Sequence, residues 1–215
     1  MPSNDPHRYA DIFKTGAEVR GASSVMLLLH GRGSSAADVL GLGREIAPPE
    51  MALVAPQASG NSWYPDSFLA PISQNEPWLS SALNMIETLV QRCFSEGVPT
   101  EGVIICGFSQ GACLATEFVA RYPRPYAALL AFTGGLIGPQ GSDLQHPGSL
   151  HGVSALFSSG DPDPHVPWTR VEESAHELRR MGAQVQIDRY PGRPHTILPQ
   201  ELSAARILIK RVLNR

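Results

Sequence analysis

Short, mainly apolar runs recur along the chain and predict strands buried on both faces of a sheet. Each run contains four to six residues, mostly Val, Ile, Leu and Ala, which is typical of parallel strands covered by helices. The runs lie at 25–29, 52–55, 102–106, 127–132 and 153–157. A sixth segment, 184–188, alternates apolar and polar residues and predicts an edge strand with one face in water.

Helical periodicity fills several of the intervals between these runs. Apolar residues recur at helical spacing in 78–93, 111–122, 171–181 and 202–213. Strands that alternate with helices predict βαβ units and a mostly parallel sheet with helices on both faces. Ligands bind beyond the carboxyl ends of the strands in such sheets, so functional residues are expected directly after the apolar runs.

The length and composition indicate one globular domain. A chain of 215 residues suits a single domain spanning 1–215 and can bury a core without disulfides or metals. We expect its first twenty residues, 1–20, to be loosely ordered. The hydrophobic fraction of 42% excludes a disordered chain, and a net charge of −3 excludes a strong electrostatic binder of nucleic acid.

The cysteines and the N-terminus bear on the cellular location of the protein. Cys93, Cys106 and Cys113 form no CxxC pair, so they predict neither a disulfide framework nor a zinc site. The N-terminus lacks the apolar stretch of a signal peptide, and the run at 25–29 is too short to span a membrane. We therefore expect a soluble cytoplasmic protein with no stable membrane insertion.

The segment Gly107-Phe108-Ser109-Gln110-Gly111 carries the clearest chemical signal. It matches G-x-S-x-G between a predicted strand and a predicted helix, the context of a nucleophilic serine. Bulky side chains at 107 and 111 would collide with the neighbouring strand and helix. The alternative interpretation is a glycine-rich turn that carries a surface serine.

A serine nucleophile needs a general base oriented by a carboxylate, in the chain order Ser, acid, His for this kind of turn. Asp161 and Asp163 both follow the predicted strand at 153–157, and their spacing does not separate them. Asp161 also suits hydrogen bonding to turn amides. His195 follows the predicted strand at 184–188 and is the best base candidate by order and position.

The other six histidines fit other roles. His30 is expected to be structural, and His165 to line the mouth of the site. Four are expected to be solvated surface residues: His7, His146, His151 and His176.

Acyl transfer also needs N–H donors aimed at the developing oxyanion. The backbone N–H of Gln110, directly after the serine, is one candidate. The second is the backbone N–H of Arg32 in His30-Gly31-Arg32-Gly33, where glycines allow close approach to a substrate. The Arg32 side chain itself is expected to be solvated.

The chain resembles the bacterial phospholipase/carboxylesterase family of α/β-hydrolases, which are relatives of the acyl-protein thioesterases. The resemblance runs in family order through His30 to Gly33, Pro56-Gln57-Ala58, Trp63-Tyr64, Gly107 to Gly111, Gly160 to Pro167 and His195. It implies an α/β-hydrolase fold and esterase or thioesterase activity with no metal or other cofactor. In this family the acid directly precedes Pro-x-Val-Pro, so the resemblance selects Asp163.

Two departures separate the chain from the eukaryotic thioesterases. The stretch between Pro56 and Trp63 is shorter, and position 32 is Arg rather than an apolar residue. The resemblance therefore leaves depalmitoylation of proteins open.

The same resemblance suggests substrate contacts. It implies that Trp63 lines the acyl pocket, whereas Tyr64 is expected to be an ordinary core aromatic. Leu136 follows the predicted strand at 127–132 and is expected to wall the pocket, with Val166 as a further contact. The polar segment 138–152 suits either a flexible flap or a surface loop.

These observations predict a serine carboxylesterase that cleaves short- to medium-chain, small-molecule esters through an acyl-enzyme. Ser109, Asp163 and His195 would be its catalytic residues, and Arg32 and Gln110 its oxyanion donors. An acyl thioesterase or lysophospholipase on the same fold is the alternative, and a non-catalytic binding protein is a third hypothesis. A homodimer is a further hypothesis.

Overall fold

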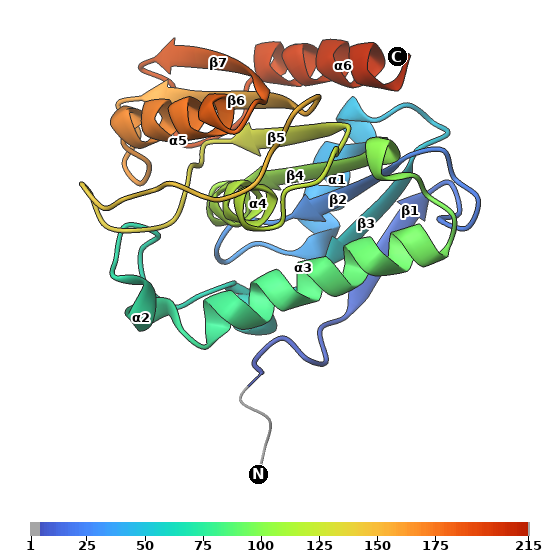
Figure 1. The fold of residues 1–215 in the computed structure, drawn as a ribbon, viewed down its shortest axis with the longest axis horizontal. Coiled ribbons are helices and arrows are strands. Elements are labelled where there is room, and N and C mark those ends of the chain that lie inside the picture. The colour runs from blue at the N-terminus through green and yellow to red at the C-terminus, as the bar shows by residue number, and fades with distance from the viewer. Residues whose placement is uncertain (1–4, 215) are drawn as a thin grey trace.

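Seven strands form one sheet in the computed structural model, which describes residues 5–214. Their order across the sheet is β1-β3-β2-β4-β5-β6-β7 (Figure 1). The strands are β1 (Ile12–Gly16), β2 (Val25–Leu29), β3 (Ala52–Pro56), β4 (Val103–Phe108), β5 (Ala128–Phe132), β6 (Ser154–Asp161) and β7 (Gln184–Pro191). Only β1 pairs antiparallel, with β3, while the remaining neighbours are parallel. The predicted mostly parallel sheet is confirmed, and β7 is an edge strand as predicted.

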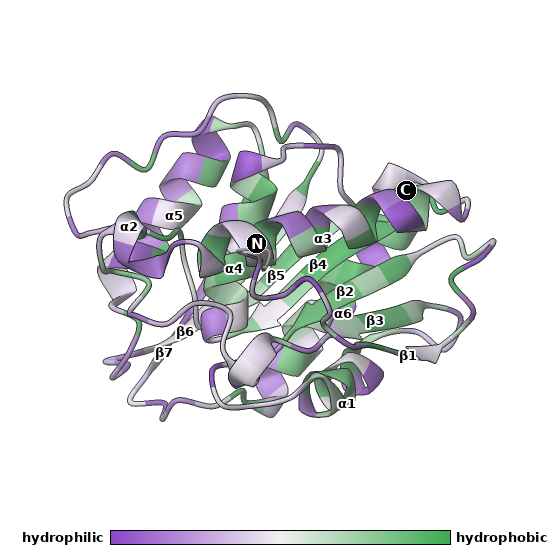
Figure 2. Cartoon of the chain, turned by 90° about the horizontal axis from the view of Figure 1, so that it is seen from below, coloured by the Kyte–Doolittle hydropathy of each residue, from purple (hydrophilic) through white to green (hydrophobic). Residues whose placement is uncertain are grey.

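Helices cover both faces of this sheet. Helices α1 (Ala36–Ile46) and α6 (Pro199–Leu213) pack on one face, and α3 (Trp78–Ser95), α4 (Gln110–Arg121) and α5 (Trp168–Arg180) pack on the other. Helix α2 (Ile72–Asn75) and 3₁₀ turns at Ser59–Asn61 and Thr100–Gly102 lie in connections. Strand β2 divides its side chains between the two cores, with Leu27 on one face and Leu28 on the other. Burial on both faces explains why the central strands are continuously apolar, as their green colour in Figure 2 shows.

Helix α1 was not expected from the apolar pattern. Ser35 and Asp38 form a capping box, in which the Asp38 N–H donates to Ser35 Oγ at 3.2 Å and the Ser35 N–H donates to Asp38 Oδ2 at 3.0 Å. Gly43 interrupts the helical composition because it packs against β2. A Cβ at that position would lie 2.7 Å from Leu28 Cδ1.

The N-terminal region corrects a prediction. Residues 5–20 include β1, and His7 is buried with 1% of its surface exposed. The His7 N–H donates to Ser81 Oγ at 2.9 Å, and its Nε2 lies 3.0 Å from Trp63 O. The expected loose order is therefore wrong for residues 5–20, because specific hydrogen bonds dock this segment onto α3 and the loop after β3. Residues 1–4 of the predicted segment lie outside the described residues.

No helix within residues 5–214 combines the length and the apolar character that crossing a membrane requires. The cytoplasmic location, the homodimer and the single-domain organisation stay predictions.

Candidate active site

Ser109 lies at a sharp turn between β4 and α4, with φ +55° and ψ −120°. A residue with a side chain holds such values at a cost, and they cluster at functional sites. The Ser109 N–H donates to Phe132 O at 2.9 Å. A Cβ on Gly107 would come within 2.3 Å of Gly111 O, and a Cβ on Gly111 within 2.1 Å of Leu29 O. Close backbone approach therefore requires both glycines, as the sequence predicts.

The Ser109 hydroxyl contacts His195, which contacts Asp163. Ser109 Oγ lies 2.9 Å from His195 Nε2, and His195 Nδ1 lies 2.8 Å from Asp163 Oδ2. An ionised carboxylate only accepts hydrogen bonds, so Nδ1 carries the proton and Nε2 accepts from the serine hydroxyl. The three residues lie at the start of α4, in the loop after β6 and in the loop after β7. The fold thus brings together three side chains that are far apart in the sequence.

The Asp163 side chain is fully buried and strongly hydrogen-bonded. Its Oδ1 accepts the backbone N–H groups of His165 at 2.9 Å and Val166 at 3.0 Å. Burial is the largest single influence and acts to raise the pKa of Asp163. The hydrogen bonds from His195 and from the two amides together outweigh it, so the pKa lies below its ordinary value. An ionised carboxylate therefore faces His195.

Asp161, the competing candidate, has a different partner. Its carboxylate pairs with the guanidinium of Arg189 on β7, and its carbonyl oxygen accepts the Gly192 N–H at 3.0 Å. The structure therefore separates the two aspartates where the spacing alone did not.

Two further histidines lie close to the serine. His30 is fully buried, and its Nε2 accepts the Ala58 N–H at 3.1 Å while its carbonyl oxygen accepts the Trp63 indole N–H at 2.8 Å. These contacts fit the structural role that was expected for it. His165 is exposed and stands edge-on to His195, with 4.9 Å between ring centroids.

Four histidines were expected at the surface, and that prediction is wrong for His7, which is buried. His151 and His176 are exposed, as expected. His146 is half-buried, and its Nε2 lies 3.5 Å from Glu117 Oε1. The surface prediction for His146 is therefore wrong, because the loop that carries it folds over a carboxylate buried on α4.

The segments that contain the two proposed oxyanion donors both adjoin Ser109. Gln110 is the first residue of α4, where a backbone N–H has no acceptor within the helix. Its side chain holds the neighbouring loop, accepting the Trp63 N–H at 3.0 Å and donating to Tyr64 O at 2.8 Å. A Cβ on Gly31 would lie 3.5 Å from Ser109 Cβ, so the turn that contains Arg32 packs against the serine.

The Arg32 side chain corrects another expectation. Its guanidinium is exposed, but it donates to Pro65 O and to Asp66 O, each at 2.6 Å. The Arg32 side chain therefore holds the loop after Tyr64 and is not simply solvated, because the two N–H groups of a planar guanidinium can bind two adjacent carbonyl oxygens.

A cavity of about 460 Å³ opens beside Ser109. Its wall combines apolar and polar groups. The lining residues are Arg32, Tyr64, Pro65, Asp66, Ser67, Phe68, Ser109, Gln110, Cys113, His165, Val166 and His195.

Two predicted substrate contacts lie elsewhere. Within residues 5–214, the lining of this cavity includes neither Trp63 nor Leu136. Trp63 is fully buried and packs on His30, with 4.9 Å between ring centroids. Leu136 is fully buried, and its N–H donates to Ser174 Oγ at 2.8 Å. Both predictions are wrong because these side chains fill the core and do not face the opening.

The structure replaces them with other wall residues. Tyr64, expected to be only a core aromatic, lines the cavity together with Phe68, Cys113 and Val166. Cys113 carried a usable signal, because it lies four residues after Ser109 on a predicted helix and so shares its face.

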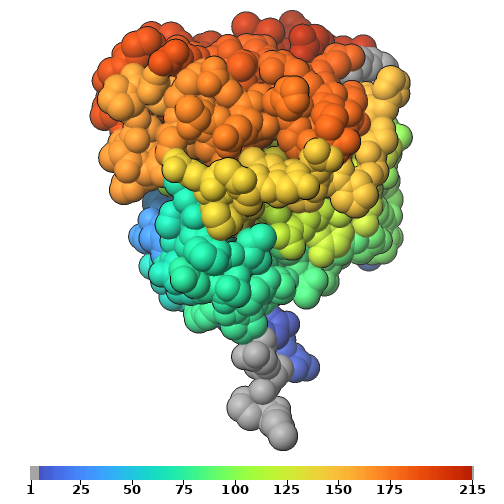
Figure 3. All heavy atoms as spheres, turned by 60° about the vertical axis from the view of Figure 1, so that its left-hand side comes forward, coloured from blue at the N-terminus to red at the C-terminus, as the bar shows by residue number. Residues whose placement is uncertain are grey.

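The segment 138–152 is fastened at several points. The buried Arg170 donates to Leu136 O at 2.9 Å and to Gly138 O at 2.7 Å, and the His146 N–H donates to Glu177 Oε1 at 2.7 Å. Figure 3 shows this segment in yellow, crossing the surface between α5 and the region of α2. It is a surface loop held to α5 in this structure.

Residues 11–213 match the family described as Phospholipase/Carboxylesterase. The chain belongs to this family. The seven-stranded, mostly parallel sheet flanked by helices is accordingly an α/β-hydrolase fold, as predicted. Within residues 5–214, no group of three or more His, Cys, Asp or Glu side chains is arranged to hold a metal ion.

Solved and curated relatives agree with this assignment. The crystal structure of a phospholipase/carboxylesterase from Dyadobacter fermentans superposes with a TM-score of 0.90 at 43% identity, covering 94% of this chain and 96% of that one. A probable carboxylesterase from Oryza sativa is 27% identical over 89% of this chain and 78% of its own length. Acyl-protein thioesterase 1 from Saccharomyces cerevisiae is 30% identical over 62% of this chain and 60% of its own length.

Proposed function

We propose that the protein is a serine carboxylesterase that hydrolyses short- to medium-chain carboxylic esters through an acyl-enzyme on Ser109. The observation that carries this proposal is the hydrogen-bonded series from Ser109 Oγ through His195 to Asp163. Family membership and the carboxylesterase relatives support the same reaction class.

In this proposal Ser109 Oγ attacks the ester carbonyl carbon while His195 Nε2 takes the hydroxyl proton. Asp163 holds the imidazole in the Nδ1–H tautomer and stabilises its charged form. The backbone N–H groups of Gln110 and Arg32 hold the oxyanion of the tetrahedral intermediate.

Collapse of the intermediate breaks the ester C–O bond, and His195 returns the proton to the leaving alcohol. Water then repeats the sequence on the acyl-enzyme. His195 removes its proton, the acid is released and the Ser109 hydroxyl is restored.

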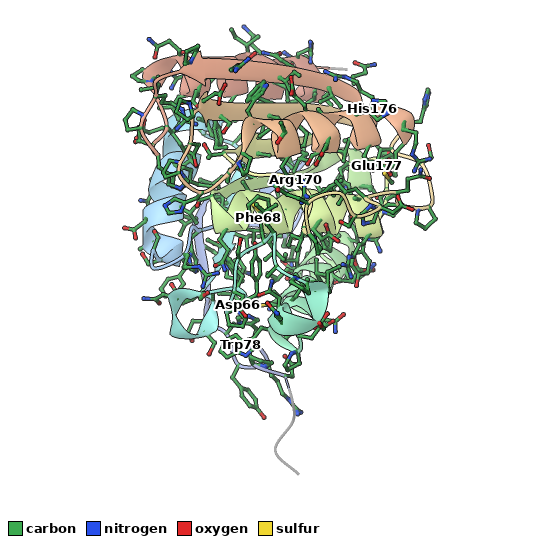
Figure 4. The ribbon with its side chains drawn as sticks, turned by 90° about the vertical axis from the view of Figure 1, so that its left-hand side faces the viewer. Asp66, Phe68, Trp78, Arg170, His176 and Glu177 are labelled. Carbon is green, nitrogen blue, oxygen red and sulfur yellow. The ribbon has the colours of Figure 1, made fainter. Side chains whose placement is uncertain are left out.

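The cavity supports the preference for short to medium chains. Phe68 is buried in its wall and lies against the guanidinium of Arg170, with 6.0 Å between Arg170 Cζ and the ring centroid (Figure 4). Phe68 lines the cavity, and we infer that an acyl chain gains burial only until it reaches this ring. Each methylene buried before that point contributes about 0.8 kcal/mol.

An acyl thioesterase is the second candidate, since the yeast relative is named an acyl-protein thioesterase. The same acyl-enzyme route serves both reactions, and only the leaving group differs. Turnover of an oxyester and a thioester with the same acyl chain separates them. A clearly higher kcat/KM for the thioester would assign the protein as an acyl thioesterase instead of a carboxylesterase.

The test of the proposal is covalent trapping followed by an ester panel. A fluorophosphonate should add once per chain by intact-protein mass, and Ser109→Ala should abolish both the adduct and the hydrolysis of p-nitrophenyl esters. A protein that neither labels nor turns over any ester would instead be a binding module. An adduct that persists in Ser109→Ala would place the nucleophile elsewhere.

A further inference from the structure

The loop that carries His195 is held by one buried guanidinium. Arg193 is 4% exposed, and its Nη1 donates to the carbonyl oxygens of Pro194, at 3.0 Å, and of Thr196. These two carbonyls flank His195 on either side. A single planar group therefore fixes the backbone before and after the imidazole.

The same guanidinium reaches the serine side of the site. Its Nη2 donates to Thr133 Oγ1 at 2.5 Å. Thr133 directly follows Phe132, whose carbonyl oxygen accepts the Ser109 N–H at 2.9 Å. Thr133 has φ +58°, unusual for a β-branched residue, and its N–H donates to Ser158 O at 2.6 Å. The segment that positions Ser109 and the loop that positions His195 thus share Arg193.

A buried carboxylate compensates the charge of Arg193. Glu201 is fully buried at the start of α6, and its Oε2 lies 3.3 Å from Arg193 Nε and accepts the Leu198 N–H at 2.8 Å. The Ser158 hydroxyl donates to Glu201 Oε1. An ion pair without contact with water needs such extra hydrogen bonds to be tolerated, and its geometry is correspondingly fixed.

We propose that Arg193 is a positioning residue that sets the contact between Ser109 Oγ and His195 Nε2 by tying the His195 loop to Thr133. Arg193 lies outside the lining of the cavity described for residues 5–214, so it acts through His195 and not on the substrate. This inference rests on the proposed function, because it assigns His195 the role of base.

The first experiment compares Arg193→Met with the wild type. The rate constant for labelling of Ser109 by a fluorophosphonate should fall on the order of 10²-fold, the cost of a misplaced reacting group. Labelling should still reach one adduct per chain, and KM for a p-nitrophenyl ester should change little while kcat falls. A purely structural loss would instead reduce the labelled fraction and leave the rate of the folded molecules unchanged.

Chemical rescue adds a second readout. Guanidinium chloride, at concentrations that leave the fold intact, should raise kcat of Arg193→Ala, whose small side chain leaves room for the ion, whereas equal NaCl should not. Arg193→Lys keeps the charge but not the fork, so it should remain slow. The matched control is Arg124→Gln, which breaks an ion pair with Glu87 at 2.6 Å and should keep the wild-type labelling rate.

Thr133→Val keeps the experiment decisive if Arg193→Met fails to fold. It removes only the acceptor between Arg193 and the serine segment and preserves the β-branched shape. Labelling should slow about tenfold, as expected for one lost hydrogen bond in the network. A folded Thr133→Val or Arg193→Met that labels at the wild-type rate overturns the proposal. Absence of labelling in the wild type would contradict the proposed function itself.

Discussion

The guanidinium of Arg170 lies over the ring of Phe68, and Phe68 lines the cavity beside Ser109. Arg170 is itself fixed by backbone carbonyls of the segment at 136–139, so the ring rests on a rigid support. We therefore expect the Phe68 side chain to limit the length of acyl chain that the site accepts.

Phe68→Ala should move the acyl preference toward longer chains. In the wild type, kcat/KM on p-nitrophenyl esters should peak at short or medium acyl length. Removing the ring opens space beyond it, and each newly buried methylene should raise kcat/KM about fourfold, from about 0.8 kcal/mol per methylene. The measurement is an acyl series from acetate to palmitate below micelle-forming concentrations. A wild-type preference that rises steadily to palmitate would show that Phe68 does not limit the chain.

The two aspartates should respond differently to the same change. Asp163→Asn favours the wrong His195 tautomer, which costs on the order of 10⁴ in kcat in the serine proteases. Asp161→Asn breaks a pair with Arg189 and should leave kcat within the same order of magnitude, since that pair is partly exposed. Steady-state kinetics and circular dichroism on both variants check this. A larger kcat loss in folded Asp161→Asn would reverse the assignment.

Ser109 should hold backbone strain that glycine relieves. At φ +55° a side chain costs on the order of 1–3 kcal/mol, whereas glycine adopts this region freely. The free energy of unfolding of Ser109→Gly should therefore exceed that of Ser109→Ala by about 1 kcal/mol, after allowing for the greater chain entropy of glycine. Ser109→Gly should accordingly unfold at a higher denaturant concentration. Urea unfolding of both inactive variants tests this. Equal stability would mean that the turn relaxes without cost.

His146 should stabilise the fold more in mild acid than in alkali. The hydrogen bond to the Glu117 carboxylate is the largest influence on the pKa of His146 and raises it above 6.5, against burial. Its Nδ1 donates to Leu144 O at 2.8 Å, so only the protonated ring presents an Nε2–H to Glu117. Because the pKa of His146 is higher in the folded than in the unfolded protein, its contribution to stability is fully present at pH values below the unfolded-state pKa. This contribution is lost as the pH rises through the folded-state pKa.

The variant His146→Gln measures this contribution. At a pH below 6.5, its free energy of unfolding should be about 1.5 kcal/mol lower than that of the wild type, which is the scale of a hydrogen bond to a charged group. The difference should shrink as pH rises above the folded pKa. The surface variant His176→Gln is the control and should show no such pH-dependent difference. A constant deficit at every pH would contradict the charge-dependent contact.

The local sequence pattern was sufficient to predict the elements whose structure depends mainly on nearby residues. The central strands are buried on both faces, so they appear as continuous apolar runs, and the turn at Ser109 is so tight that only glycine fits at 107 and 111. Helix α1 also carried a local signal in the Ser35–Asp38 capping box. Strand β1 did not, because only pairing with β3 makes that half-exposed segment a strand.

The sequence by itself determined the order of the candidate residues, while only the tertiary structure decided which of them meet. Chain order and strand–turn–helix context pointed to Ser109 and His195, because the carboxyl ends of parallel strands share one edge. The orientation of Trp63 and Tyr64, the docking of His7 and the burial of Arg193 depend on packing between segments far apart in the chain. Neighbouring residues with similar local preferences, such as Trp63 and Tyr64, end in different environments, one in the core and one in the cavity wall. The reason is that elements far away in the chain pack against each side chain.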